Sequence, residues 1–164
     1  MHALTRRSRH EEGAAAVEFA LVSSVLFLVL FGMIQYGLWF SDSLSTRQGV
    51  REGARHAVVE SFGYDASCTT GTNSARLRCS TRKDIGAIAG TPYVKVNAAN
   101  WQKGKAVVVC AMVKADGALG LLPMPNGGWI TSKTQMSIEQ ATQAGAWTNT
   151  ADALPAGATW DWCS

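Results

Sequence analysis

The sequence lacks charge over one long stretch. Residues 19–40 contain no Asp, Glu, Lys or Arg, although the whole chain of 164 residues carries 15 basic and 12 acidic side chains. A helix of this length spans about 33 Å, close to the hydrocarbon thickness of a bilayer. Gln35 and the pair Ser23 and Ser24 are its only clearly polar side chains. The stretch predicts one membrane-spanning helix, followed by a modest domain.

Other absences exclude whole classes of function. There is no concentrated basic face, because the net charge is +3 and falls to +2 once residues 1–13 are left out, so we expect no nucleic-acid partner. The sequence has no G-x-S-x-G, P-loop or H-E-x-x-H motif, and its three histidines, His2, His10 and His56, are scattered. We expect neither an enzyme nor a bound metal or cofactor.

All four cysteines follow the apolar segment, and none forms a C-x-x-C pair, which argues against a zinc ribbon or a thioredoxin-type site. An even number of cysteines in an oxidising compartment favours disulfides. Of the three possible connectivities we expect Cys68–Cys79, closing a short polar loop, and Cys110–Cys163, joining the C-terminal tail to a strand. A buried free thiol at Cys110 is the alternative.

The residues before the apolar stretch set its orientation. Arg6, Arg7 and Arg9 precede it and favour a cytoplasmic N-terminus, with the rest of the chain outside the cytoplasm. A secretory signal peptide would have a shorter apolar core and a small-x-small cleavage site, whereas this run continues into large residues and ends at Ser41-Asp42-Ser43. An uncleaved signal anchor explains the length but not Glu18.

Glu18 stands at the front edge of the apolar stretch, where a carboxylate is costly unless it lies at the interface or is paired. One interpretation is a tolerated headgroup-level charge near a helix N-terminus. The other requires Gly13: a cut after it would give Ala14 a new α-amino group and make Glu18 the fifth residue of the mature chain. In a bundle of such helices, Glu18 could then neutralise a neighbour's amine, because an unpaired buried charge is unfavourable.

The residues around Gly13 and Glu18 resemble a known type of signal sequence. A basic leader ending in Gly13, followed by Ala14-Ala15-Ala16-Val17-Glu18-Phe19 and a long apolar run, resembles the class III signal of type IV pilin-like proteins, and most closely the TadE family of pseudopilins of the tight-adherence (Flp/Tad) pilus. The Gly-Ala-Arg stretch within residues 49–55 is similar to one that this family carries after its membrane helix. The resemblance covers about residues 6–60. It implies cleavage between Gly13 and Ala14 by a prepilin peptidase, with Glu18 and Phe19 acting in processing and assembly.

Residues 41–60 contain no proline, so we expect the membrane helix to continue outside the bilayer. Its expected apolar stripe, on which the downstream domain would pack, comprises Leu44, Val50, Ala54, Ala57 and Val58. Arg47, Arg51 and Arg55 share another face, either as a solvated stripe partly balanced by Glu52 or as a contact for anionic lipid or a partner subunit. Gly49-x-x-x-Gly53 permits close helix approach.

The remaining chain predicts a small sheet. We expect a polar loop over residues 61–82, a short helix over 83–89, and strands over 93–96, 105–115 and 129–140. Residues 141–164 are rich in Ala, Thr and Gly, but Trp147, Trp160, Trp162 and Cys163 indicate that part of this tail docks. An antiparallel sheet packed on the long helix is the simplest architecture.

The predicted fold class is therefore α+β, with a long N-terminal membrane-spanning helix packed at its outer half on a small antiparallel sheet. We divide the chain into a cleaved leader (1–13), the helix and its extension (14–60) and an extracytoplasmic domain with disulfides (61–164). The resemblance implies a single-pass protein of the cytoplasmic membrane, a minor pilin whose partners are a prepilin peptidase, other pilins or pseudopilins, the inner-membrane assembly platform and lipid. The alternatives are an uncleaved single-pass protein presenting a binding domain, with Trp147, Trp160 and Trp162 as candidate contacts, and, less favoured, an anchored enzyme.

Overall fold

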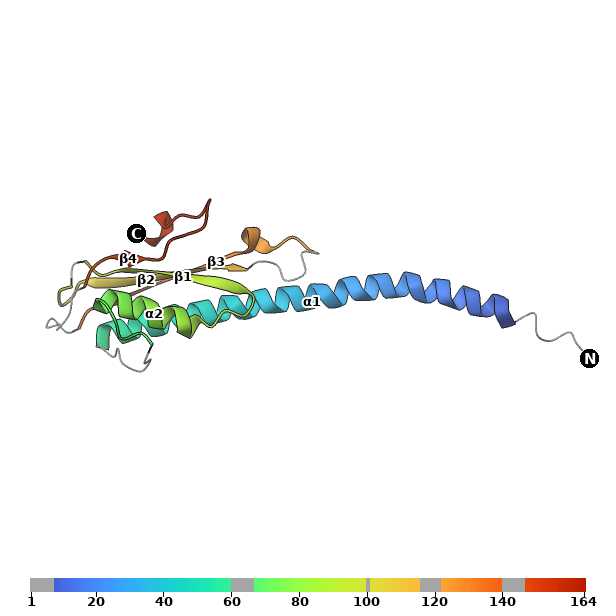
Figure 1. Cartoon of the computed structure of the whole chain (residues 1–164), viewed down its shortest axis with the longest axis horizontal. Helices are drawn as coiled ribbons and strands as arrows, with labels where there is room; N and C mark the ends of the chain where they lie inside the picture. Colours follow the sequence, from blue (N-terminus) through green and yellow to red (C-terminus); the bar gives the residue numbers. More distant parts are fainter. Residues whose placement is uncertain (1–7, 60–66, 100, 116–121, 140–146) are drawn as a thin grey trace, which may run out of the picture.

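The computed structural model describes residues 8–59, 67–99, 101–115, 122–139 and 147–164. The elements run in the order α1 (Ser8–Val59), α2 (Asn73–Ile85), β1 (Gly90–Asn97), β2 (Ala106–Ala115), η1 (Pro125–Gly128), β3 (Trp129–Ser137), β4 (Thr150–Ala151) and η2 (Asp161–Cys163). Figure 1 shows the sheet and α2 gathered along one end of α1, whose N-terminal half extends away from them. The predicted α+β fold class is confirmed.

Helix α1 is continuous over 52 residues, so it is about 78 Å long. The predicted continuation of the apolar helix beyond residue 40 is confirmed, since Asp42 and Ser43 lie inside α1 and start no new helix. The face that meets the domain includes Val50, Ala54 and Ala57, which are fully buried. Leu44 does not belong to that face, because its side chain is 44% exposed, and its assignment to the packing stripe was wrong.

The sheet has the strand order β3-β2-β1-β4, and all three pairings are antiparallel. Alternation along β1 and β2 turns Val94, Val96, Val107 and Val109 toward the helices, where all four are fully buried. Together with Leu77 and Ile85 of α2 and the α1 residues above, they form one core between the sheet and the two helices. The strands are close to those expected, with β1 longer and β3 shorter than predicted.

Helix α2 corrects the sequence prediction. A polar loop was expected over residues 61–82 and a short helix after it, but α2 already begins at Asn73 and ends at Ile85. The hydroxyl of Thr72 accepts a hydrogen bond from the Ala75 amide, which caps the helix start, and Gly86 in the left-handed region ends it. The helix was missed because it buries few apolar side chains, so its hydrophobic periodicity is weak.

The Gly49-x-x-x-Gly53 pair is used within the chain, between α1 and α2. A methyl group on Gly49 would lie 2.6 Å from Cγ1 of Ile85 and 2.9 Å from its backbone nitrogen, and one on Gly53 would overlap the Thr81 side chain. Both glycines and Thr81 are buried. The two glycines therefore let α2 approach α1 closely, as small residues do at tight helix crossings.

This contact gives a stability prediction. Gly49→Ala should destabilise the fold by about 1–3 kcal/mol, because the overpacking against the Ile85 backbone exceeds the gain in helix propensity of about 1 kcal/mol. Guanidinium unfolding of the full chain in detergent micelles, followed by near-UV circular dichroism, measures the change. Gly37→Ala is the matched control, because no atom lies within 4 Å of a methyl group at Gly37. Equal midpoints for the two variants would contradict the tight crossing.

Candidate functional site

The N-terminal half of α1 is an apolar surface that the rest of the described chain leaves uncovered. Phe19, Leu21 and Leu26 are 72%, 68% and 60% exposed. The helix is long and apolar enough to cross a membrane, and only 6% of its most apolar 18-residue window is buried. A core helix of a soluble protein would bury such a window, so this exposure calls for an apolar environment outside the chain.

The four residues singled out for processing and assembly all lie on this uncovered part of α1. Gly13, Ala14, Glu18 and Phe19 are exposed and helical. Glu18 follows Gly13 by about 7.5 Å along the helix axis, at 1.5 Å per residue. No described residue forms an ion pair with the Glu18 carboxylate.

The domain first meets α1 inside the apolar stretch, at residues 32–36. Nε2 of Gln35 donates to the Leu122 carbonyl oxygen at 2.7 Å and to Sδ of Met124 at 3.0 Å, and the Tyr36 hydroxyl donates to the Pro123 carbonyl oxygen at 3.0 Å. Gln35 is only 2% exposed. Gln35 is thus a docking residue for the segment that precedes η1, a role that the sequence did not reveal.

About two turns beyond Gln35, Asp42 joins α1 to the connection between α2 and β1. Its side chain is 1% exposed, and its two carboxylate oxygens accept hydrogen bonds from the amides of Ile88 at 2.8 Å and Ala89 at 2.9 Å. A buried carboxylate needs such donors, because burial removes its hydration. Asp42 therefore attaches the end of the domain that lies nearest the apolar half of α1.

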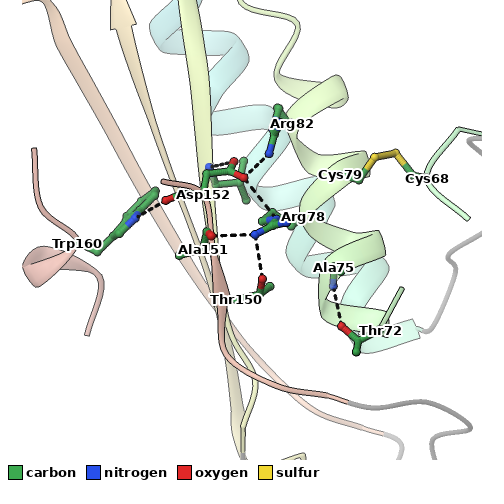
Figure 2. A network of polar contacts seen from close by, with 11 residues as sticks. Cys68, Thr72, Ala75, Arg78, Cys79, Arg82, Thr150, Ala151, Asp152 and Trp160 are labelled. Carbon is green, nitrogen blue, oxygen red and sulfur yellow. Dashed lines mark hydrogen bonds and ion pairs between the residues drawn. A yellow bond between two sulfur atoms is a disulfide. The ribbon is translucent and has the colours of Figure 1, made fainter. Parts of the chain in front are cut away.

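The C-terminal segment is attached through Asp152, as Figure 2 shows. Its carboxylate lies 3.4 Å from Nε of Arg78, pairs with Arg82 and accepts from the Val94 amide at 2.9 Å, while its backbone carbonyl accepts from Nε1 of Trp160. No sequence motif pointed to these contacts of Asp152. Its partners lie on α2 and β1, far along the chain, so no local pattern marks them.

Both expected disulfides are present. Cys68 pairs with Cys79 across the start of α2, and Cys110 of β2 pairs with Cys163 of η2. The second bond holds the C-terminal segment against the face of β2 that points away from the helices, because Val109 and Ala111 on either side of Cys110 belong to the core. Part of the tail therefore docks, as the tryptophans indicated.

The three tail tryptophans do not form one exposed cluster. Trp147 is 8% exposed and stacks on Trp101 with ring centroids 3.8 Å apart. Trp160 and Trp162 lie 5.9 Å apart and donate to carbonyl oxygens of Asp152 and Thr159. Their indole groups serve contacts within the chain, which weakens the interpretation of a common binding surface.

Charged side chains of α1 border an open groove beside α2. The groove has a volume of about 440 Å³ and is lined by Gln48, Gly49, Arg51, Glu52 and Asp84. The expected arginine stripe of α1, comprising Arg47, Arg51 and Arg55, is exposed, and Glu52 faces His56 at 3.1 Å. Within the described ranges no three His, Cys, Asp or Glu side chains gather as a metal site.

Comparison with known proteins bears on α1. The sequence model of one protein family, described as TadE-like protein, matches residues 13–55, which begin at Gly13 and end at Arg55. Neither the curated proteins nor the solved structures give a match. The matched residues contain the residues predicted to act in processing and assembly, together with the helix crossing at Gly49 and Gly53, and the predicted resemblance is confirmed over them. Residues 13–55 of this chain are thus similar to the family of TadE-like proteins.

Proposed function

We propose that this chain is a minor pilin or pseudopilin of a Tad (Flp, type IVb) pilus, processed by a prepilin peptidase after Gly13 and acting in pilus assembly or initiation. The observation that carries the proposal is the TadE-like match, which falls on a continuous helix whose N-terminal half is apolar and exposed. In this proposal α1 anchors the protein in the cytoplasmic membrane, with the sheet domain outside the cytoplasm.

The basic leader and the disulfides support that orientation. Arg6, Arg7 and Arg9 precede the apolar helix, as cytoplasmic flanks do, whereas both disulfides lie in the domain after it. A prepilin peptidase would therefore act on Gly13 at the cytoplasmic side of the membrane. Glycine suits the site because it lets the chain leave the helix and enter a protease cleft in an extended form.

The exposed half of α1 supports recruitment into a helical assembly. Before assembly its apolar side chains would contact lipid, and within a bundle they would contact the helices of other pilins or of the assembly platform. Glu18 stays hydrated at a membrane interface but loses water in a bundle, where the new α-amino group of Ala14 on a neighbour would neutralise it. This pairing would select one axial position for each subunit.

The alternative, an uncleaved membrane protein that presents a binding domain, has less support. Its candidate contacts, Trp147, Trp160 and Trp162, are engaged within the fold, and it assigns no role to Gly13 and Glu18.

Processing gives the first test of this proposal. We expect a mature chain of 151 residues (164 minus 13) that begins at Ala14. Gly13→Leu should retain the leader, because the bulky side chain obstructs the extended conformation that cleavage requires. Intact mass and N-terminal sequencing of protein from the native membrane measure both. Gly37→Leu, a similar change in the same helix, should be processed normally. A native N-terminus at Met1 or after Ser43 would reject the pseudopilin assignment.

Assembly gives the second test. Glu18→Gln should leave insertion and cleavage nearly unchanged, because the apolar stretch keeps its length, but should reduce recruitment to the assembly complex by about tenfold or more, in keeping with the cost of leaving a charge unpaired. The exchange Val17→Glu with Glu18→Val should also fail, since one residue rotates the carboxylate by about 100° around the helix. Co-purification and counts of surface pili give the readout.

Glu52→Gln is the control for the Glu18 variants, because Glu52 lies on the same helix beside the domain and should leave recruitment unchanged. Normal piliation by both Glu18 variants would show that this carboxylate is only a tolerated interfacial charge.

A further inference from the structure

The apolar part of α1 that the domain leaves free is too short to cross a bilayer unless Glu18 also enters the hydrocarbon. Counted from Phe19 to the residue before Gly32, where the domain begins to cover the helix, it has 13 residues and spans about 20 Å. The hydrocarbon of a bilayer is about 30 Å thick, which requires about 20 helical residues. With Glu18 at one boundary, the hydrocarbon extends to about Leu38.

The domain therefore meets α1 below the membrane surface. Gly32 and Gln35 precede Leu38 by six and three residues, so they lie about 9 and 4.5 Å inside that boundary. Residues 122–124 contact α1 at this depth, through Gln35, Tyr36 and the close approach of Leu122 to Gly32. The contact places part of the domain in hydrocarbon.

The chemistry of residues 122–125, Leu-Pro-Met-Pro, suits that environment. No side chain among them is charged, and the two prolines carry no backbone N–H group that would need an acceptor. The carbonyl oxygens of Leu122 and Pro123 accept hydrogen bonds from Gln35 and Tyr36. In lipid, where water is absent, backbone polar groups have to be satisfied within the protein.

The side chains around the contact are apolar and exposed, as immersion in hydrocarbon requires. Met33 and Ile34, on the faces of α1 that the domain leaves open, are 67% and 46% exposed. Phe40 is 59% exposed just beyond the boundary. Ile88 is 72% exposed, and its amide is fixed by Asp42, four residues or about 6 Å beyond Leu38, at headgroup level. Apolar exposure therefore continues from the helix onto the near end of the domain.

We propose that residues 122–125 are immersed in the hydrocarbon of the leaflet on the domain side, docked on α1 by Gln35 and Tyr36. The partner of this surface is the acyl-chain region of the lipid. The inference rests on the proposed membrane span of α1 and fixes its depth. It also gives a role to Nε2 of Gln35, which donates to the Leu122 carbonyl oxygen, while Oε1 of Gln35 is buried and accepts no hydrogen bond from the described residues.

Thiol accessibility in nanodiscs of phosphatidylethanolamine and phosphatidylglycerol tests the inference with the full chain. The four native cysteines are disulfide-bonded, so a charged maleimide reacts only with an introduced thiol. Pro123→Cys should react at least about tenfold more slowly than Lys103→Cys, because hydrocarbon excludes both the reagent and the thiolate. Both positions are exposed in the protein itself, and Lys103 lies in the β1–β2 turn at the opposite end of the sheet. The two thiols should react equally after denaturation in SDS.

A second variant tests the docking. Gln35→Leu keeps the apolar stretch but removes the donor to Leu122, so the Pro123→Cys thiol should react several-fold faster in this background. Gln48→Leu, an exposed glutamine on the same helix, should not change the rate.

The outcomes separate this inference from the proposed span. Equal rates for Pro123→Cys and Lys103→Cys in protein that stays in the nanodisc would overturn the immersion and leave the span intact. Protein that does not enter the nanodisc would overturn both.

Discussion

One uninterrupted helix has to satisfy two environments. The N-terminal half of α1 exposes apolar side chains all round, whereas the C-terminal half buries one face beneath a sheet and a second helix. Between them the fully buried side chains are polar, namely Gln35, Asp42 and Thr46, and the Thr46 hydroxyl donates to the Asp42 carbonyl oxygen at 2.6 Å. Only further on does this face become small and apolar, with Gly49, Val50 and Ala54. The hydrogen bonds from Gln35 to the Leu122 carbonyl oxygen and from the Ile88 and Ala89 amides to Asp42 fix where the domain docks along the helix.

Local sequence patterns predicted the parts of the fold that depend on local physics. The charge-free stretch predicted the apolar half of α1, the absence of proline predicted its continuation, and the valine-rich runs predicted β1 and β2. Leu44 was placed on the packing face because it is apolar, but the side chains that are buried on either side of it, Asp42 and Thr46, are polar. Helix α2 was missed because its burial relies on Leu77, Ile85 and the glycines of α1, which no single window of sequence contains.

The residues of the candidate site likewise include some that the sequence could select and others that it could not. The sequence alone selected Gly13, Ala14, Glu18 and Phe19, because they lie close together in one short segment. The TadE-like match covers all of them. The residues that join the domain to α1 could not be selected, because Gln35 and Asp42 find their partners 87 and 46 residues away. A lone glutamine in an apolar run and an aspartate after it carry no signal until the fold supplies those partners.

Asp152 also closes one edge of the sheet. Strand β4 pairs with β1 only at Lys95 and Val96, but the Asp152 amide donates to the Val94 carbonyl oxygen at 3.0 Å, and the Asp152 carboxylate accepts from the Val94 amide. The Asp152 side chain thereby continues the hydrogen bonding between β1 and β4 beyond the last paired residue of β4. Open strand edges recruit strands from other chains. The contact between Asp152 and Val94 therefore leaves less of the β1 edge open to strand exchange with another copy of the chain.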